Sequence, residues 1–133
     1  HDYEVPAYTR ELSHEIFMTV LGQPPYQRID IKGWRFLLLN SMLGPTWDPA
    51  DPLYDKGKAS YGVAQLAWLD RELAGDAPTI VMSHYMLSLA QRDENAGAQP
   101  DLIAVLGVHA SKIPIVLTGH THRWLNFTTL PQF

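Results

Sequence analysis

Two short apolar runs in the sequence lead into histidine, the side chain that proteins use most often to bind metal ions. The run at residues 79–82 is followed two positions later by His84. The run at residues 113–118 is followed directly by Gly-His-Thr-His at positions 119–122. In open α/β sheets, ligands bind beyond the carboxyl ends of the strands. If both runs are strands, the sequence predicts a metal site formed by His84, His120 and His122.

The spacing of the last two histidines suits a site with two metal ions. In extended backbone, residues i and i+2 point to the same side and lie about 7 Å apart. That separation fits one histidine on each of two ions that lie about 3.5–4 Å apart. His84, from a neighbouring parallel strand, could then join His120 on one ion, and Gly119 is expected to allow a sharp turn. Three unconnected polar residues at strand ends remain the alternative interpretation.

The composition narrows the class of protein. A chain of 133 residues with 46% hydrophobic residues predicts one globular domain with its own core. The net charge of −4 has no basic stripe, which argues against binding to a nucleic acid duplex. No apolar run approaches the roughly 18 residues of a membrane span. The absence of cysteine limits metal ligands to His, Asp, Glu or Asn and, with no export signal in view, favours the cytoplasm.

Hydrophobic periodicity and turn residues predict the elements that would carry the histidines. Two strands joined by Lys32-Gly33 are expected to form a hairpin, because a two-residue link with glycine is a hairpin signal. A long loop at 41–59 follows the hairpin. The predicted helices cover residues 7–21, 61–73 and 100–110, and the predicted strands cover residues 26–31, 34–40, 79–82, 113–118 and 124–130. This order predicts a layered α/β domain.

The pattern also predicts which side chains are buried. The second hairpin strand lacks alternation around Leu38, so we expect it to be covered on both faces, and the run at 113–118 is typical of a buried strand. His14 falls on the polar side of its helix and is expected at the surface. The acidic residues of the long loop are expected to be solvated. They are Asp48, Asp51 and Asp55.

Three segments resemble, in the same order, motifs of the calcineurin-like metallophosphoesterases, and within them the bacterial branch related to cyclic-nucleotide phosphodiesterases. His1-Asp2 resembles the end of the family's Gly-Asn-His-Asp motif. The strand at residues 79–84 resembles the one that carries the family's mid-chain histidine ligand. The Gly-His-Thr-His at 119–122 matches the family's Gly-His-X-His motif in full. Residues 65–69 are similar to a packing helix of the family.

The resemblance implies a layered αββα sandwich, of which residues 1–133 would be the C-terminal part of a single domain. It also implies a phosphodiesterase or phosphomonoesterase with two divalent ions, Mn, Fe or Zn. His84 and His120 would bind one ion, together with an asparagine preceding His1, and His122 would bind the other. A hydroxide between the ions would attack phosphorus, and His1 would protonate the leaving oxygen. The substrate would be a phosphorylated small molecule or a nucleotide.

The chain also departs from the family pattern. It has no Asp-X-His motif and no Gly-Asp motif at the family's position ahead of Gly-Asn-His-Asp, so the bridging aspartate and other ligands are missing and the centre would be incomplete. One alternative is a mononuclear zinc hydrolase with three histidine ligands. Another is a non-catalytic fragment that binds a partner through its tryptophans, with an exposed apolar face that is also expected if half the domain is absent. His1 itself is either catalytic or the remnant of a purification tag. The tryptophans are Trp34, Trp47, Trp68 and Trp124. The substrate, the choice of metal and the oligomeric state stay open.

Overall fold

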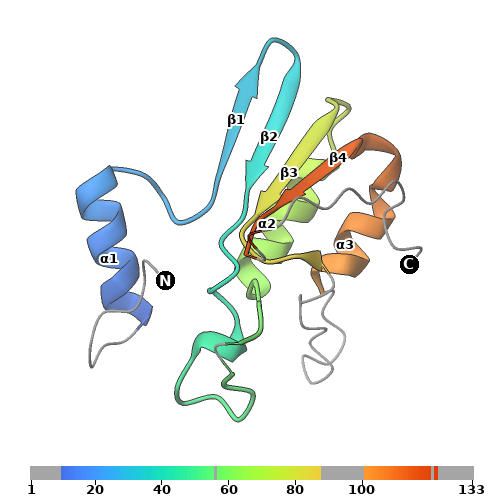
Figure 1. The fold of residues 1–133 in the computed structure, drawn as a ribbon. Coiled ribbons are helices and arrows are strands. Elements are labelled where there is room, and N and C mark those ends of the chain that lie inside the picture. Colours follow the sequence, from blue (N-terminus) through green and yellow to red (C-terminus); the bar gives the residue numbers. More distant parts are fainter. Residues whose placement is uncertain (1–9, 56, 88–100, 121, 123–133) are drawn as a thin grey trace.

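A four-stranded mixed sheet with three helices forms the described part of the protein (Figure 1). The structure is a computed structural model that describes residues 10–55, 57–87, 101–120 and 122. The strands are β1 (Gln27–Ile31), β2 (Trp34–Leu38), β3 (Thr79–Ser83) and β4 (Ile115–Thr118), in the spatial order β1-β2-β3-β4. The helices are α1 (Arg10–Leu21), α2 (Val63–Leu73) and α3 (Leu102–Val108), with short 3-10 segments η1 (Pro45–Trp47) and η3 (Ala110–Lys112). The protein is therefore a small, open α/β structure, as the sequence predicts.

The first two strands form the predicted hairpin. β1 and β2 pair antiparallel, from Gln27 opposite Leu38 to Ile31 opposite Trp34. Lys32 and Gly33 connect the strands with φ angles of 49° and 84°. Two successive positive φ angles are typical of a type I′ turn, whose twist matches that of the flanking strands. The hairpin prediction is confirmed.

The next three strands run parallel and bring their carboxyl ends to one edge of the sheet. Leu38 of β2 pairs with Met82 of β3, and Met82 pairs with Leu117 of β4. Ser83 and Thr118 form the last pair between β3 and β4. The helix α2 lies between β2 and β3 in the chain, and α3 lies between β3 and β4. This register places the segments that follow β3 and β4 side by side.

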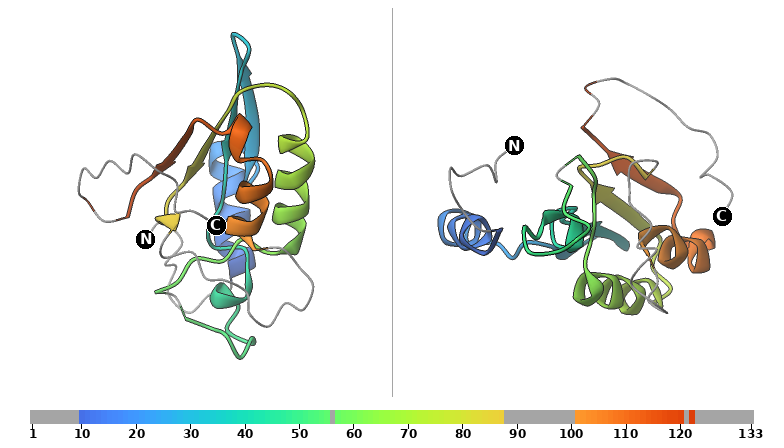
Figure 2. Two further views of the ribbon diagram at one scale, coloured as in Figure 1. Left: turned by 90° about the vertical axis from the view of Figure 1, so that its right-hand side faces the viewer. Right: turned by 90° about the horizontal axis from the view of Figure 1, so that it is seen from below.

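One face of the sheet packs against α2 and α3 (Figure 2). Leu37 of β2 and Val81 of β3 are fully buried there. The helix α2 contributes leucines at the three- to four-residue spacing that the sequence predicts, and α3 contributes Val105 and Leu106. The Asp101 side chain accepts a hydrogen bond of 2.8 Å from the Ala104 N–H and so caps the start of α3. The α2 leucines are Leu66, Leu69 and Leu73.

The opposite face of the sheet is apolar, and its side chains are exposed or half-buried, which corrects two predictions. β2 is not covered on both faces, and β4 is not a buried strand: its side chains Ile115 and Leu117 are 45% and 47% exposed. Among the described elements, Figure 2 shows no helix over this face. The run of apolar residues was a correct sign of a strand, but burial depends on a covering layer. The register places nine apolar side chains on this face, which we name the open face: Ile29, Ile31, Trp34, Phe36, Leu38, Ile80, Met82, Ile115 and Leu117.

The long loop after β2 is ordered by its own side chains. Its three predicted solvated acids accept hydrogen bonds of 2.8–3.0 Å from backbone N–H groups two residues ahead, as in Asx turns. The hydroxyl groups of Thr46 and Ser60 lie 2.6 Å apart and join the two ends of the loop. Near its end, Gly62 has φ of 71°, and a Cβ atom there would lie 2.8 Å from the Leu43 carbonyl oxygen. The loop therefore needs glycine at this position. The acids are Asp48, Asp51 and Asp55.

Some predictions fall outside the described residues. They are the strand at 124–130, the start of the first helix at 7–9 and the position of His1. Within the described part of the chain, none of the helices combines the length and the apolar character needed to cross a membrane.

Candidate metal centre

His84 and His120 lie together at the carboxyl edge of the parallel strands. His84 directly follows β3, and His120 follows β4 after Gly119. The Nε2 atom of His84 and the Nδ1 atom of His120 are 3.2 Å apart, within hydrogen-bond distance. The two rings meet edge to face, with centroids 5.2 Å apart and an angle of 82° between the planes. Two residues 36 positions apart in the chain are thus joined through their imidazole nitrogens.

The backbone holds these two histidines in place. The Gly119 N–H donates a hydrogen bond of 2.9 Å to the His84 carbonyl oxygen, which links the two backbones just beyond the last pair of β3 and β4. The turn predicted at Gly119 falls elsewhere, because the positive φ angles belong to His120 (72°) and His122 (53°). Histidine enters this left-handed region more readily than most side chains do. The backbone is therefore not extended at His120 or at His122, and the predicted i, i+2 geometry for the two histidines is wrong.

The ring of Tyr85 completes the group. It stacks on the imidazole of His120, with centroids 4.2 Å apart and planes inclined by 24°. It also meets the His84 ring edge to face at 5.3 Å. Burial raises the pKa of the Tyr85 hydroxyl, and the negative charge of Asp55 adds to this effect. Tyr85 therefore stays neutral at physiological pH. Periodicity gave no sign of its role, because its partner is distant in the chain.

A buried polar network lies next to the site, at the end of β2. The side chain of Gln65 accepts from the Asn40 N–H and donates to the Asn40 carbonyl oxygen, both at 2.8 Å. The Nδ2 atom of Asn40 lies 3.1 Å from Nε2 of His14. His14 is 8% exposed, so the prediction of a surface histidine is wrong. His14 faces this network rather than water, which helical periodicity alone cannot reveal.

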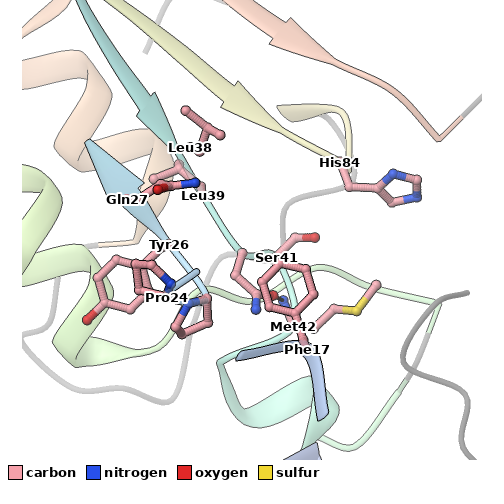
Figure 3. Close-up of a pocket in the computed structure, with 11 residues that line it drawn as sticks. Phe17, Pro24, Tyr26, Gln27, Leu38, Leu39, Ser41, Met42 and His84 are labelled. Carbon is pink, nitrogen blue, oxygen red and sulfur yellow. Dashed lines mark hydrogen bonds between the residues drawn. The ribbon is translucent and has the colours of Figure 1, made fainter. Parts of the chain in front are cut away.

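A cavity of about 270 Å³ opens between α1 and the carboxyl end of β2 (Figure 3). Figure 3 shows His84 at the rim of the cavity, with its ring on the side away from Tyr26 and Pro24. The walls are mostly apolar, and His84 is one of four polar residues that line the cavity. The apolar lining residues are Phe17, Pro24, Pro25, Tyr26, Leu38, Leu39 and Met42, and the other polar ones are Gln27, Asn40 and Ser41.

The structure brings together two of the four predicted site residues. His122 is exposed, and His1 lies outside the described residues. Within the described ranges, no group of three or more His, Asp or Glu side chains is placed to hold a metal ion. The two histidines that do meet have nitrogens spaced as metal ligands. Two ligands 2.0–2.1 Å from one tetrahedral ion are separated by about 3.3 Å, close to the observed 3.2 Å. This donor pair therefore fits one divalent ion.

Comparisons of the chain with protein-family models, curated proteins and solved structures find no match.

Proposed function

We propose that the protein is part of a metal-dependent phosphoester hydrolase, with His84 and His120 on one divalent ion and His122 on a second. The observation that supports this best is the 3.2 Å separation between Nε2 of His84 and Nδ1 of His120. These nitrogens stand at the strand edge where open α/β sheets bind their ligands. The motif resemblance at 119–122 selects phosphoester hydrolysis among metal-dependent reactions.

The chemistry assigned to this chain begins with the protons on its histidines. In the metal-free protein one of the two facing nitrogens carries the proton of their hydrogen bond. Both nitrogens must be deprotonated to act as ligands, so metal binding releases a proton or moves it to the other ring nitrogen. When bound, Mn, Fe or Zn would supply charge to stabilise phosphoryl oxygens and would lower the pKa of coordinated water. The proposed substrate is a phosphorylated small molecule or nucleotide, and His1 would protonate the leaving oxygen.

The open face supports the finer fold assignment, a layered αββα sandwich. The face carries nine apolar side chains and spans all four strands. Sheets made of parallel strands are almost always covered on both faces. Two sheets that pack face to face interdigitate the apolar side chains of their inner faces. We therefore assign the open face to contact with a second sheet of the same domain.

The decisive experiment is to measure bound metal after dialysis of the chain against Mn²⁺ or Zn²⁺. We expect the wild-type chain to retain metal and the His84→Ala and His120→Ala variants to lose it. His109→Ala is the matched control, because His109 pairs with Asp70 at 2.8 Å and does not belong to the proposed site. Hydrolysis of bis-p-nitrophenyl phosphate and p-nitrophenyl phosphate then distinguishes diesterase from monoesterase activity.

The stoichiometry separates the proposal from its alternatives. Two ions per chain, with one lost in His122→Ala, would support the dinuclear site. One ion that needs all three histidines would support the mononuclear zinc alternative. A wild-type chain that binds no metal would contradict the proposed function.

A further inference from the structure

Tyr85 is the most constrained of the three rings at the proposed centre. Its side chain belongs to the buried core, and the residue is 4% exposed. His84 is exposed, and His120 is half-buried. A ring that is fixed by core packing restricts a neighbour that it stacks on, whereas two rings outside the core leave each other free to rotate. The stack therefore restricts rotation of the His120 ring, because the core holds Tyr85 in place.

His120 needs such a restraint because its own backbone does not supply one. The residue lies in a turn with φ of 72°, beyond the last paired residue of β4. Rotation of its imidazole about χ2 has broad minima, since this bond joins sp³ and sp² atoms. Only a narrow range of χ2 directs Nδ1 at Nε2 of His84. The observed stack, with centroids 4.2 Å apart and planes inclined by 24°, selects that range.

We propose that Tyr85 is a positioning residue, whose ring holds the His120 imidazole so that its Nδ1 faces Nε2 of His84 before a metal ion binds. This inference rests on the proposed function, because it assigns Tyr85 to the same metal site. Tyr85 would not be a ligand of the ion. It acts through the ring of His120, in the way that outer groups orient metal ligands in other proteins.

The stack is a property of the aromatic ring, so the phenylalanine and leucine variants should behave differently. Tyr85→Phe keeps the ring and is expected to bind metal as the wild type does. Tyr85→Leu keeps an apolar side chain in the core but removes the stack, and should bind metal about tenfold more weakly, the lower end of the range for ligand-orienting groups. The matched control is Trp68→Leu, which removes a ring contact between α2 and Tyr26, the residue before β1.

The experiment has two readouts on the full chain. NMR of the metal-free protein records the chemical shifts of the His120 ring protons, which a stacked tyrosine or phenylalanine moves upfield. Titration with Zn²⁺ then gives the affinity of each variant. We expect the upfield shift and the wild-type affinity to persist in Tyr85→Phe and Trp68→Leu, and both to be lost in Tyr85→Leu.

The outcomes separate this inference from the proposed function. If the wild-type chain binds Zn²⁺ and Tyr85→Leu binds it equally well, Tyr85 does not position His120. Equal weakening in Trp68→Leu would also overturn the inference, because it would reflect general loss of structure. If the wild-type chain binds no Zn²⁺, the proposed function itself fails, and the role of Tyr85 at the metal site fails with it.

Discussion

Gln65 of α2 hydrogen-bonds both backbone polar groups of Asn40, the second residue after β2. Its Oε1 accepts from the Asn40 N–H, and its Nε2 donates to the Asn40 carbonyl oxygen, each at 2.8 Å. The same Nε2 donates to the carbonyl oxygen of Tyr61. Gln65 is 1% exposed, so water cannot easily replace these bonds. One amide side chain thus links α2 to the backbone just beyond the end of β2.

We predict that Gln65→Glu strongly destabilises the fold. Glutamate has nearly the same shape, but its carboxylate cannot donate to the carbonyl oxygens of Asn40 and Tyr61. Two buried acceptors and a buried charge would be left uncompensated, which should lower the free energy of unfolding by about 3 kcal/mol or more at pH 7. Urea denaturation measures this loss. Ala67→Glu, at an exposed position of the same helix, should change it by less than about 0.5 kcal/mol. Similar values for both variants would contradict the role of Gln65.

We predict that Gly62→Ala costs more stability than Gly33→Ala. Both glycines have positive φ, 71° and 84°, so alanine is strained at each position. At Gly62 the added Cβ would also meet the Leu43 carbonyl oxygen at 2.8 Å, whereas at Gly33 it would enter open space. We expect a loss of about 3 kcal/mol for Gly62→Ala and about 1 kcal/mol for Gly33→Ala. Thermal or urea unfolding measures the loss of stability in each variant. Equal losses in the two variants would show that the contact with the Leu43 carbonyl oxygen adds nothing.

The buried hydroxyl of Tyr61 should make stability depend on pH in the alkaline range. Burial raises the pKa of Tyr61 to about 12, against an opposing hydrogen bond with Ser83. The native state therefore keeps this proton at pH values where the unfolded chain has lost it. The contribution of the protonated Tyr61 hydroxyl to the free energy of unfolding is fully present below pH 10 and is lost as the pH rises toward 12.

The pH dependence of Tyr61 can be measured against Tyr61→Phe. The stability difference between wild type and variant should fall by about 2–3 kcal/mol between pH 10 and pH 12. Comparison with the variant removes the contributions of all other ionisable groups, because both proteins contain them. A difference that does not change with pH would show that the Tyr61 hydroxyl is not held in its neutral form.

The open face should bind apolar probes. We predict that the chain enhances the fluorescence of ANS and that the double variant Ile115→Lys, Leu117→Lys reduces this effect, because both side chains of β4 belong to the open face and are about half exposed. Val108→Lys is the matched control, since Val108 is 78% exposed on α3 and belongs to no part of the open face. If the double variant enhances ANS fluorescence as much as the wild type does, the probe binds to a surface other than the open face.

Local patterns were sufficient to predict most elements of the fold. The Lys32-Gly33 link marked the hairpin because a type I′ turn needs two residues that accept positive φ. The period of the leucines marked α2, and the runs ending near His84 and His120 marked two strands. Burial could not be predicted in this way. An apolar run in a strand looks the same whether a second layer covers it or not, so β4 was expected to be buried and is half exposed.

The sequence by itself determined that two histidine-bearing segments follow neighbouring strands, because strand periodicity and turn chemistry act over a few residues. Only the tertiary structure decided which nitrogens meet. The 3.2 Å contact between His84 and His120 depends on the parallel register of β3 and β4, and the stack of Tyr85 depends on its burial in the core. The burial of His14 likewise depends on where α1 packs against Asn40. These relationships join residues 26 to 36 positions apart, and no local pattern specifies them.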